Sequence, residues 1–257
     1  MHLNYETTGN ENGPALILVH GFLSSRAQWL PNIETLGEIY HLVTVELWGH
    51  GDSPLPDEDA FTLARYNEEL EKIRTDLGIE RCGVIGQSYA AGLALRYAIN
   101  QPDRTAGVVV TNSRSAFGDI RTQRRPPPQN NDRGDADVDT SKNRHLPIHP
   151  VYARRLPGAI KQELVDAADN MSALAIERGG RLGLPLHSLE ILDDVPVPVL
   201  LTNGVFEKSF QGDADNIRQN HPGIRIVDLD GGHAVNIEAA DQFNQAVLDF
   251  FSEIGFS

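Results

Sequence analysis

The chain has 257 residues, of which 40% are hydrophobic and 23% are charged, and its formal net charge is −14. This length suits one large α/β domain with room for an inserted segment. The negative charge argues against binding to nucleic acid and to anionic membrane surfaces, so neither is expected as a partner.

Cys82 is the single cysteine, which excludes a disulfide within the chain and suits a reducing compartment. It opens an apolar run, so we expect a buried and inert thiol. The first residues, Met1 to Glu6, show no basic region followed by an apolar run. No apolar segment approaches the roughly 18 residues that span a bilayer. These features predict a cytoplasmic protein.

Apolar runs of strand length alternate with helical patterns along the chain, which is typical of a mainly parallel sheet with helices on both faces. A first edge strand is expected at 3–7, where apolar and polar residues alternate. Helices are expected at 64–77 and at 239–254, whose apolar residues recur at helical spacing. Further strands are expected at 16–20, 42–47, 82–86, 107–111, 197–202 and 224–229.

The segment 115–194 interrupts this alternation. It divides the predicted fold into an α/β core, 1–114 with 195–257, and an inserted cap. The proline- and arginine-rich part at 121–128 offers little apolar surface for a core, whereas 159–174 has a helical pattern. Because the insert lies between two strands, we expect it over their carboxyl ends, where ligands bind in open α/β sheets.

The stretch from Cys82 to Gly92 places one serine between a strand and a helix. The apolar strand pattern ends at Gly86, Ser88 follows, and a helical pattern occupies 93–99. Small residues around the serine allow the strand and the helix to approach closely. A serine at such a turn presents its hydroxyl above the sheet edge, beside the positive end of the helix dipole. This pattern predicts a nucleophilic serine.

A nucleophilic serine needs a base and an acid that orients the base, and in such a sheet they follow the serine in this order. His233 is the candidate base, because it follows a predicted strand in a turn with two glycines. Glu207 is the candidate acid, three residues after the glycine that follows another predicted strand. Asp213 and Asp215 remain alternatives for the acid.

The oxyanion formed during attack on a carbonyl needs hydrogen-bond donors. A glycine after the second predicted strand lets the chain bend, so that the N–H of Phe22 can face Ser88. The N–H of Tyr89 is the second candidate donor. The glycine-rich turn at 46–54 is interpreted as a loop that shapes the sheet edge, with a direct substrate contact from Trp48 as the alternative.

Four motifs resemble, in order and spacing, those of the α/β-hydrolase superfamily. They are His20-Gly21-Phe22, Gly49-His50-Gly51-Asp52-Ser53, Gly86-Gln87-Ser88-Tyr89-Ala90 and Gly232-His233. The resemblance spans nearly the whole chain except the cap. The small size of the chain and its His20-Gly21-Phe22 motif are similar to those of the branch that contains carboxylesterases, lactonases, carbon–carbon hydrolases of ring-cleavage products and the menaquinone-pathway synthase. Ala90 stands where that family usually has glycine, and Glu207 where it usually has aspartate.

The residues and the resemblance together predict a serine hydrolase that cleaves a small carboxylic ester, lactone or thioester through an acyl-enzyme. We expect no metal or organic cofactor, and a small molecule as the partner; the oligomeric state is left open. Two alternatives remain. One is a carbon–carbon bond hydrolase or elimination enzyme acting on a small carboxylated keto substrate. The other is a slow-turnover, hydrolase-like signalling receptor.

Basic residues in and beside the cap make an anionic substrate an open alternative. Residues 114–181 carry 12 Lys and Arg against 9 Asp and Glu, a net charge of +3, which leaves −17 on the rest of the chain. A solvated basic surface is the other interpretation. The candidate contacts for a substrate carboxylate are Arg114, Arg124, Arg125, Arg154 and Arg155.

Overall fold

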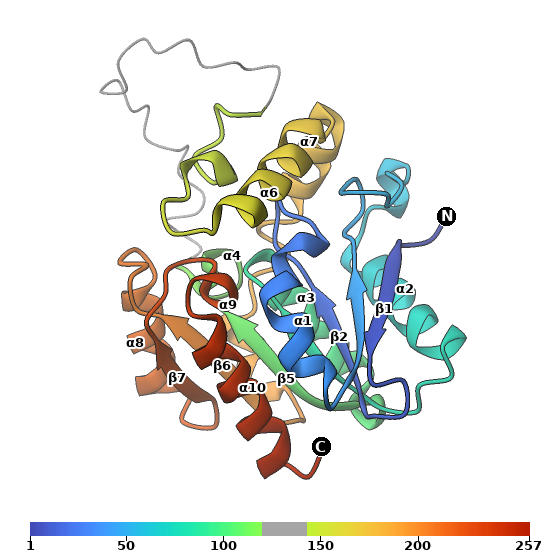
Figure 1. Ribbon diagram of the computed structural model, residues 1–257, viewed down its shortest axis with the longest axis vertical. Coiled ribbons are helices and arrows are strands. Elements are labelled where there is room, and N and C mark those ends of the chain that lie inside the picture. Colours follow the sequence, from blue (N-terminus) through green and yellow to red (C-terminus); the bar gives the residue numbers. More distant parts are fainter. Residues whose placement is uncertain (120–142) are drawn as a thin grey trace.

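The computed structural model describes residues 1–119 and 143–257, and its centre is one twisted sheet (Figure 1). The seven strands lie in the order β1-β3-β2-β4-β5-β6-β7. The edge strand β1 is antiparallel to β3, and every other neighbouring pair is parallel. Helices cover both faces. The predicted architecture, a mostly parallel sheet flanked by helices, is confirmed.

Each strand lies within two residues of its expected bounds. The edge strand begins at Tyr5 and not at Leu3; the N–H of Leu3 instead donates to the carboxylate of Glu69 at 3.3 Å. The strands are β1 Tyr5–Gly9, β2 Ala15–Val19, β3 His41–Val45, β4 Cys82–Gly86, β5 Thr105–Thr111, β6 Val199–Gly204 and β7 Arg225–Leu229.

The helices differ from expectation mainly at two places. The pattern at 93–99 belongs to a longer helix that begins directly after Ser88. Two neighbouring helical segments were expected in the insert, the first at 159–174; the first helix ends earlier, at Asn170, and Ser172 caps the second by accepting the N–H of Ala175 at 3.1 Å. The helices are α1 Leu30–Gly37, α2 Leu63–Asp76, α3 Tyr89–Asn100, α4 Arg114–Phe117, α6 Gly158–Asn170, α7 Ala173–Arg181, α8 Gln211–Asn220, α9 Val235–Glu238 and α10 Ala240–Glu253.

The sheet separates two apolar cores, because successive side chains of a strand point to opposite faces. In β2, Ile17 and Val19 join the core beneath α2 and α3, whereas Leu16 and Leu18 join the core beneath α1 and α10. Cys82 is buried in the first of these, and burial raises the pKa of its thiol to about 12, as expected for an inert cysteine. Both faces of the central strands are therefore packed, and the sheet is a firm base for the loops at its edge.

The helices α6 and α7 lie beyond the carboxyl ends of the central strands (Figure 1). Leu164 of α6 packs with Ile237 of α9, and Ala175 of α7 packs with Leu23 in the loop after β2. The described part of the insert thus contacts loops at the carboxyl edge of the sheet; its exact boundaries stay a prediction. Among the residues described, no helix is long and apolar enough to cross a membrane.

Candidate active site

Ser88 occupies the sharp turn between β4 and α3. Its backbone has φ 50° and ψ −110°, a conformation that costs roughly 1–3 kcal/mol for a residue other than glycine. The end of β4 and the start of α3 approach each other closely at this turn, because a Cβ added to Gly86 would lie 2.4 Å from the carbonyl oxygen of Ala90. Ala90 itself is fully buried within this turn, so alanine is accommodated where the family usually has glycine. The N–H of Ser88 donates to the Thr111 hydroxyl at 3.0 Å.

The loop after β2 faces this serine. β2 and β4 are neighbours at the point where the strand order reverses, the usual ligand site of an open α/β sheet. A Cβ added to Gly21 would lie 2.0 Å from Oε1 of Gln87 and 3.3 Å from Cβ of Ser88, so the loops touch, and a side chain here would have to displace the Gln87 amide. The predicted donors flank this contact: Phe22 follows Gly21, and the N–H of Tyr89 is at the start of α3, where no intrahelical acceptor is available.

His50 holds the loop after β2 in place. Leu23 has a positive φ of 54°, and its N–H donates to Nε2 of His50 at 3.2 Å. Nδ1 of the same ring lies 3.1 Å from the carbonyl oxygen of Trp48, so the ring donates from Nδ1 and accepts at Nε2. Burial, with the charge of nearby His20, lowers the pKa of His50 to about 3. The imidazole is therefore neutral and remains an acceptor over the working pH range.

His233 and Glu207 meet at the same edge, on the loops after β7 and β6. Nδ1 of His233 lies 3.0 Å from each carboxylate oxygen of Glu207. The side chain of His233 is 49% exposed, so part of the ring remains accessible. Its carbonyl oxygen accepts a hydrogen bond from Nε2 of Gln87 at 3.3 Å, which fastens the His233 loop to the residue before Ser88.

The two groups stabilise each other's charged forms. Burial by itself would raise the pKa of Glu207, but the hydrogen bond and charge of His233, with help from Asn112 and Arg114, lower it. Desolvation by itself would lower the pKa of His233, but the hydrogen bond and charge of Glu207, with the charge of Glu238, raise it. The arrangement favours an imidazolium beside a carboxylate, which is the state that a base reaches after taking a proton.

The alternative carboxylates have other surroundings. Asp215 pairs with Arg218 at 3.1 Å. Asp213 lies in the first turn of α8, and burial raises its pKa even though the charge of Arg114 opposes this. Of the three candidates for the acid, Glu207 is the one hydrogen-bonded to His233.

Two residues that the sequence analysis did not single out organise the site. The side-chain amide of Asn112 donates to Oε2 of Glu207 at 2.9 Å and to the carbonyl oxygen of Gly204 at 3.0 Å. Its carbonyl oxygen accepts the N–H of Gly204 at 3.0 Å. Gln87 provides the link to His233 described above. A signal for Asn112 was present, since it is a polar residue directly after a strand that ends at the same edge.

The predicted substrate contacts lie in different settings. Trp48 is 1% exposed, and its ring packs against Phe61 and Tyr66, so it belongs to the core beneath the turn. This placement fits the loop-shaping interpretation and not a surface contact. Arg154 is exposed on the insert. Arg124 and Arg125 lie outside the described residues.

The other two predicted arginines face the acidic groups of the site. Arg114, at the start of α4, places its charge near Glu207 and Asp213; it helps to lower the pKa of Glu207 and opposes the rise that burial causes in the pKa of Asp213. The guanidinium of Arg155 lies 4.2 Å over the ring of Phe206 and 3.8 Å from Oε2 of Glu238.

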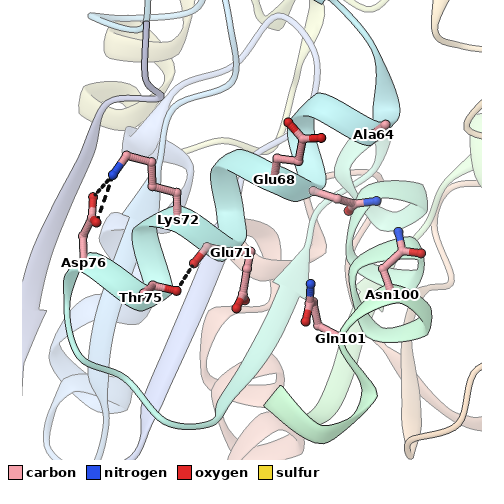
Figure 2. A pocket seen from close by; sticks show the side chains of 9 residues that line it. Ala64, Glu68, Glu71, Lys72, Thr75, Asp76, Asn100 and Gln101 are labelled. Carbon is pink, nitrogen blue, oxygen red and sulfur yellow. Dashed lines mark hydrogen bonds and ion pairs between the residues drawn. The ribbon is translucent and has the colours of Figure 1, made fainter.

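A separate open groove of about 580 Å³ lies between α2 and α3, away from these residues (Figure 2). Several polar side chains around it pair with one another: Nζ of Lys72 contacts the Asp76 carboxylate at 2.7 Å, and the hydroxyl of Thr75 donates to the Glu71 carbonyl at 2.8 Å. No candidate catalytic residue lines it. In the described ranges, no three His, Cys, Asp or Glu side chains form a candidate metal site.

Comparisons with known proteins agree with this fold. Residues 14–240 match the family model described as alpha/beta hydrolase fold. Carboxylesterase YbfK of Bacillus subtilis is 24% identical over 250 residues, which cover 95% of this chain and 82% of that protein.

Solved structures show the same fold. The enol-lactonase from Burkholderia xenovorans LB400 superposes with a TM-score of 0.75 at 18% identity, over 97% of this chain and 96% of that one. MenH from S. aureus superposes with a TM-score of 0.76 at 20% identity, over 99% of each chain. The chain belongs to the α/β-hydrolase family and is a hydrolase.

Proposed function

We propose that the protein is a serine hydrolase in which Ser88 is the nucleophile, His233 the base and Glu207 the acid, acting on a small carboxylic ester, lactone or thioester. The observation that carries the proposal is the contact of His233 with Glu207, at 3.0 Å, beside the strained turn of Ser88. A nucleophile on a sharp turn and an oriented histidine are the two parts that acyl transfer requires.

The reaction would begin when His233 takes the proton of the Ser88 hydroxyl and the oxygen attacks the substrate carbonyl. Glu207 would stabilise the imidazolium, and the low pKa of that carboxyl keeps it ionised for this role. The tetrahedral intermediate would collapse as the imidazolium returns the proton to the leaving alcohol or thiol. A water molecule, deprotonated by His233, would then cleave the acyl-enzyme and release the acid and Ser88.

The N–H groups of Phe22 and Tyr89 would hold the oxyanion in both halves of the reaction. Loss of one such donor typically costs roughly 3 kcal/mol of transition-state stabilisation. The contact between Gly21 and the Ser88 turn, and the bond that holds Leu23 on His50, support this assignment. They keep the loop after β2 against the nucleophile before any substrate arrives.

The substrate would be a small molecule bound between the Ser88 turn and the insert. The names of relatives favour an ester or a lactone, since one is a carboxylesterase and a structural neighbour is an enol-lactonase. Arg114, whose charge already acts on Glu207, keeps a carboxylated substrate as a second candidate. A reducing, cytoplasmic location is consistent with the single buried cysteine.

Substitution of the nucleophile tests the proposal. Ser88→Ala should abolish turnover of p-nitrophenyl esters and labelling by a fluorophosphonate probe, while the circular dichroism spectrum and Tm stay close to those of the unsubstituted protein. Ser88→Ala keeps the Cβ and removes only the hydroxyl, so the backbone strain of the turn is unchanged and loss of fold is not expected. Full esterase activity in folded Ser88→Ala protein would overturn the proposal, and a single slow turnover in the unsubstituted protein would favour the receptor alternative.

A further inference from the structure

A second carboxylate supports the loop that carries His233. Glu238 ends the short helix α9, and its Oε2 accepts the N–H of Gly232 at 2.9 Å. The side chain is only 11% exposed. A Cβ added to Gly232 would lie 2.9 Å from Oε1 and 3.0 Å from Oε2, so any side chain at this position would have to displace the Glu238 carboxylate. The backbone directly before His233 is thus held against this carboxylate.

The insert contacts the same carboxylate through Arg155. Nη1 of Arg155 lies 3.8 Å from Oε2 of Glu238, and its guanidinium lies over the ring of Phe206, the residue before Glu207. The N–H of Phe206 donates to the carbonyl of Gly231 at 2.8 Å. One arginine of the insert therefore joins the loops of His233 and Glu207, which already touch each other.

Apolar packing reinforces this connection. Leu156 and Ile160, which follow Arg155, pack in a small cluster with Ala234 and Ile237, on either side of the turn that Glu238 closes. Arg155 is therefore anchored at its base by apolar contacts, although its own side chain is 55% exposed. An ion pair this exposed contributes little energy alone, so its effect depends on the anchoring.

We propose that Glu238 is a positioning residue for His233, holding the Gly232–His233 backbone by a charge-assisted hydrogen bond, and that Arg155 fastens this carboxylate to the insert. The use of His233 as a base rests on the proposed function. A carboxylate that accepts a backbone N–H makes one of the stronger hydrogen bonds available to a loop. A displacement of about 1 Å in a catalytic group can cost roughly 100-fold in rate.

The charges around His233 act on its pKa. The charged groups that act on His233 from its neighbours are Glu207, in direct contact, and Glu238, and both favour the imidazolium. Arg155 opposes the charge of Glu238, and Arg114 opposes that of Glu207. Loss of the Glu238 charge should therefore lower the pKa of His233, and loss of the Arg155 charge should raise it.

Three variants separate the hydrogen bond from the charge. Glu238→Gln keeps an oxygen that can accept the Gly232 N–H but removes the charge, Glu238→Ala removes both, and Arg155→Gln removes the opposing charge. The titration of His233 is followed by NMR on protein with ¹³C-labelled histidine, its resonance being identified by its loss in His233→Gln. This readout does not require turnover. The kcat of p-nitrophenyl acetate hydrolysis is measured from pH 5 to pH 9.

We expect the titration midpoint of His233 to move down in Glu238→Gln and up in Arg155→Gln. At the high-pH plateau, Glu238→Ala should lose about tenfold in kcat, and Glu238→Gln should recover most of that loss. Unchanged midpoints in both charge variants, or plateau rates in Glu238→Ala equal to those of the unsubstituted protein, would overturn the proposal. If Glu238→Ala does not fold, the His233 titration midpoints of Glu238→Gln and Arg155→Gln still test the proposal. An unsubstituted protein without turnover would contradict the serine-hydrolase function but leave the titration test intact.

Discussion

The carboxylate of Glu207 contacts His233 and Asn112 at once, with Nδ1 of His233 3.0 Å from both of its oxygens and the Asn112 amide 2.9 Å from Oε2. The amide thereby limits the rotation of a side chain that is one methylene longer than the usual aspartate. Because Asn112 also binds the backbone of Gly204 through both of its polar atoms, it holds the loop and the carboxylate together. The longer acid is accommodated with its hydrogen bond to the histidine intact.

This arrangement predicts that Glu207→Gln lowers kcat by more than about tenfold, because an amide cannot stabilise the imidazolium that forms during attack. Asp213→Asn and Asp215→Asn serve as matched controls on α8, and both should stay within about twofold of the unsubstituted rate. Steady-state kinetics on one ester would compare the three variants. If kcat falls in Asp213→Asn or Asp215→Asn and stays unchanged in Glu207→Gln, then Glu207 is not the acid.

The pH dependence should reflect the raised pKa of His233. A protonated imidazole cannot accept the Ser88 proton, so kcat/KM should rise with pH, with a midpoint above the ordinary histidine value of about 6.5. Glu207 carries its charge through this range, because its pKa is lowered. Glu207→Gln should move the midpoint down, since it removes the group that stabilises the imidazolium. A midpoint at or below 6.5 in the unsubstituted protein would contradict this account.

The strands and the order of the chemical groups could be predicted from the sequence, because apolar runs and glycine turns are local signals. Ser88 and His233 stand out since each follows such a run directly. Asn112 also follows a strand directly, but its partner, like the role of Glu238, could not be identified in the same way. Asn112 acts on a residue 95 positions later in the chain, and Glu238 acts across a turn whose shape depends on Gly232.

The structure of the insert was the least predictable part, because the contacts that determine it are also not visible as a local sequence pattern. The helical pattern at 159–174 is real, yet α6 ends at Asn170 and Ser172 caps the start of α7, a choice between local hydrogen bonds that periodicity does not reveal. Arg155 illustrates the limit for charge. Its place in a basic segment suggested a contact with substrate, whereas its neighbours are Phe206 and Glu238.

The bond between Leu23 and His50 predicts a role for the glycine-rich turn in holding the oxyanion donor Phe22. His50→Ala would leave the N–H of Leu23 without its acceptor and release a residue with positive φ. We expect kcat to fall about tenfold with KM nearly unchanged, since the oxyanion is bound only after attack.

His50→Gln is the matched control, because its side-chain oxygen can accept the same N–H and should restore part of the rate. Tm would be measured for both variants, as His50 is buried. A lower Tm with an unchanged kcat in His50→Ala would mean that the turn supports the fold alone.

The last prediction concerns the charge of the substrate. The net-positive stretch at 114–181, beside a strongly acidic remainder of the chain, would raise the local concentration of anionic ligands and could pair with a substrate carboxylate. Arg154 is exposed on the insert, and Arg124 and Arg125 lie in the part outside the described residues. If they serve this purpose, Arg154→Ala and the double variant Arg124→Ala/Arg125→Ala should each raise KM about threefold for a carboxylated ester, the size of effect expected for an exposed charge pair. A neutral ester of similar size should be unaffected.

Added salt should reproduce the effect in the unsubstituted protein, since dissolved ions screen exposed charges over about 8 Å at physiological ionic strength. Arg155→Ala is the contrasting variant: because Arg155 contacts Phe206 and Glu238, it should change the rate with both esters alike. Equal KM values for both substrates in the Arg154 and Arg124/Arg125 variants would mean that these arginines form a solvated surface.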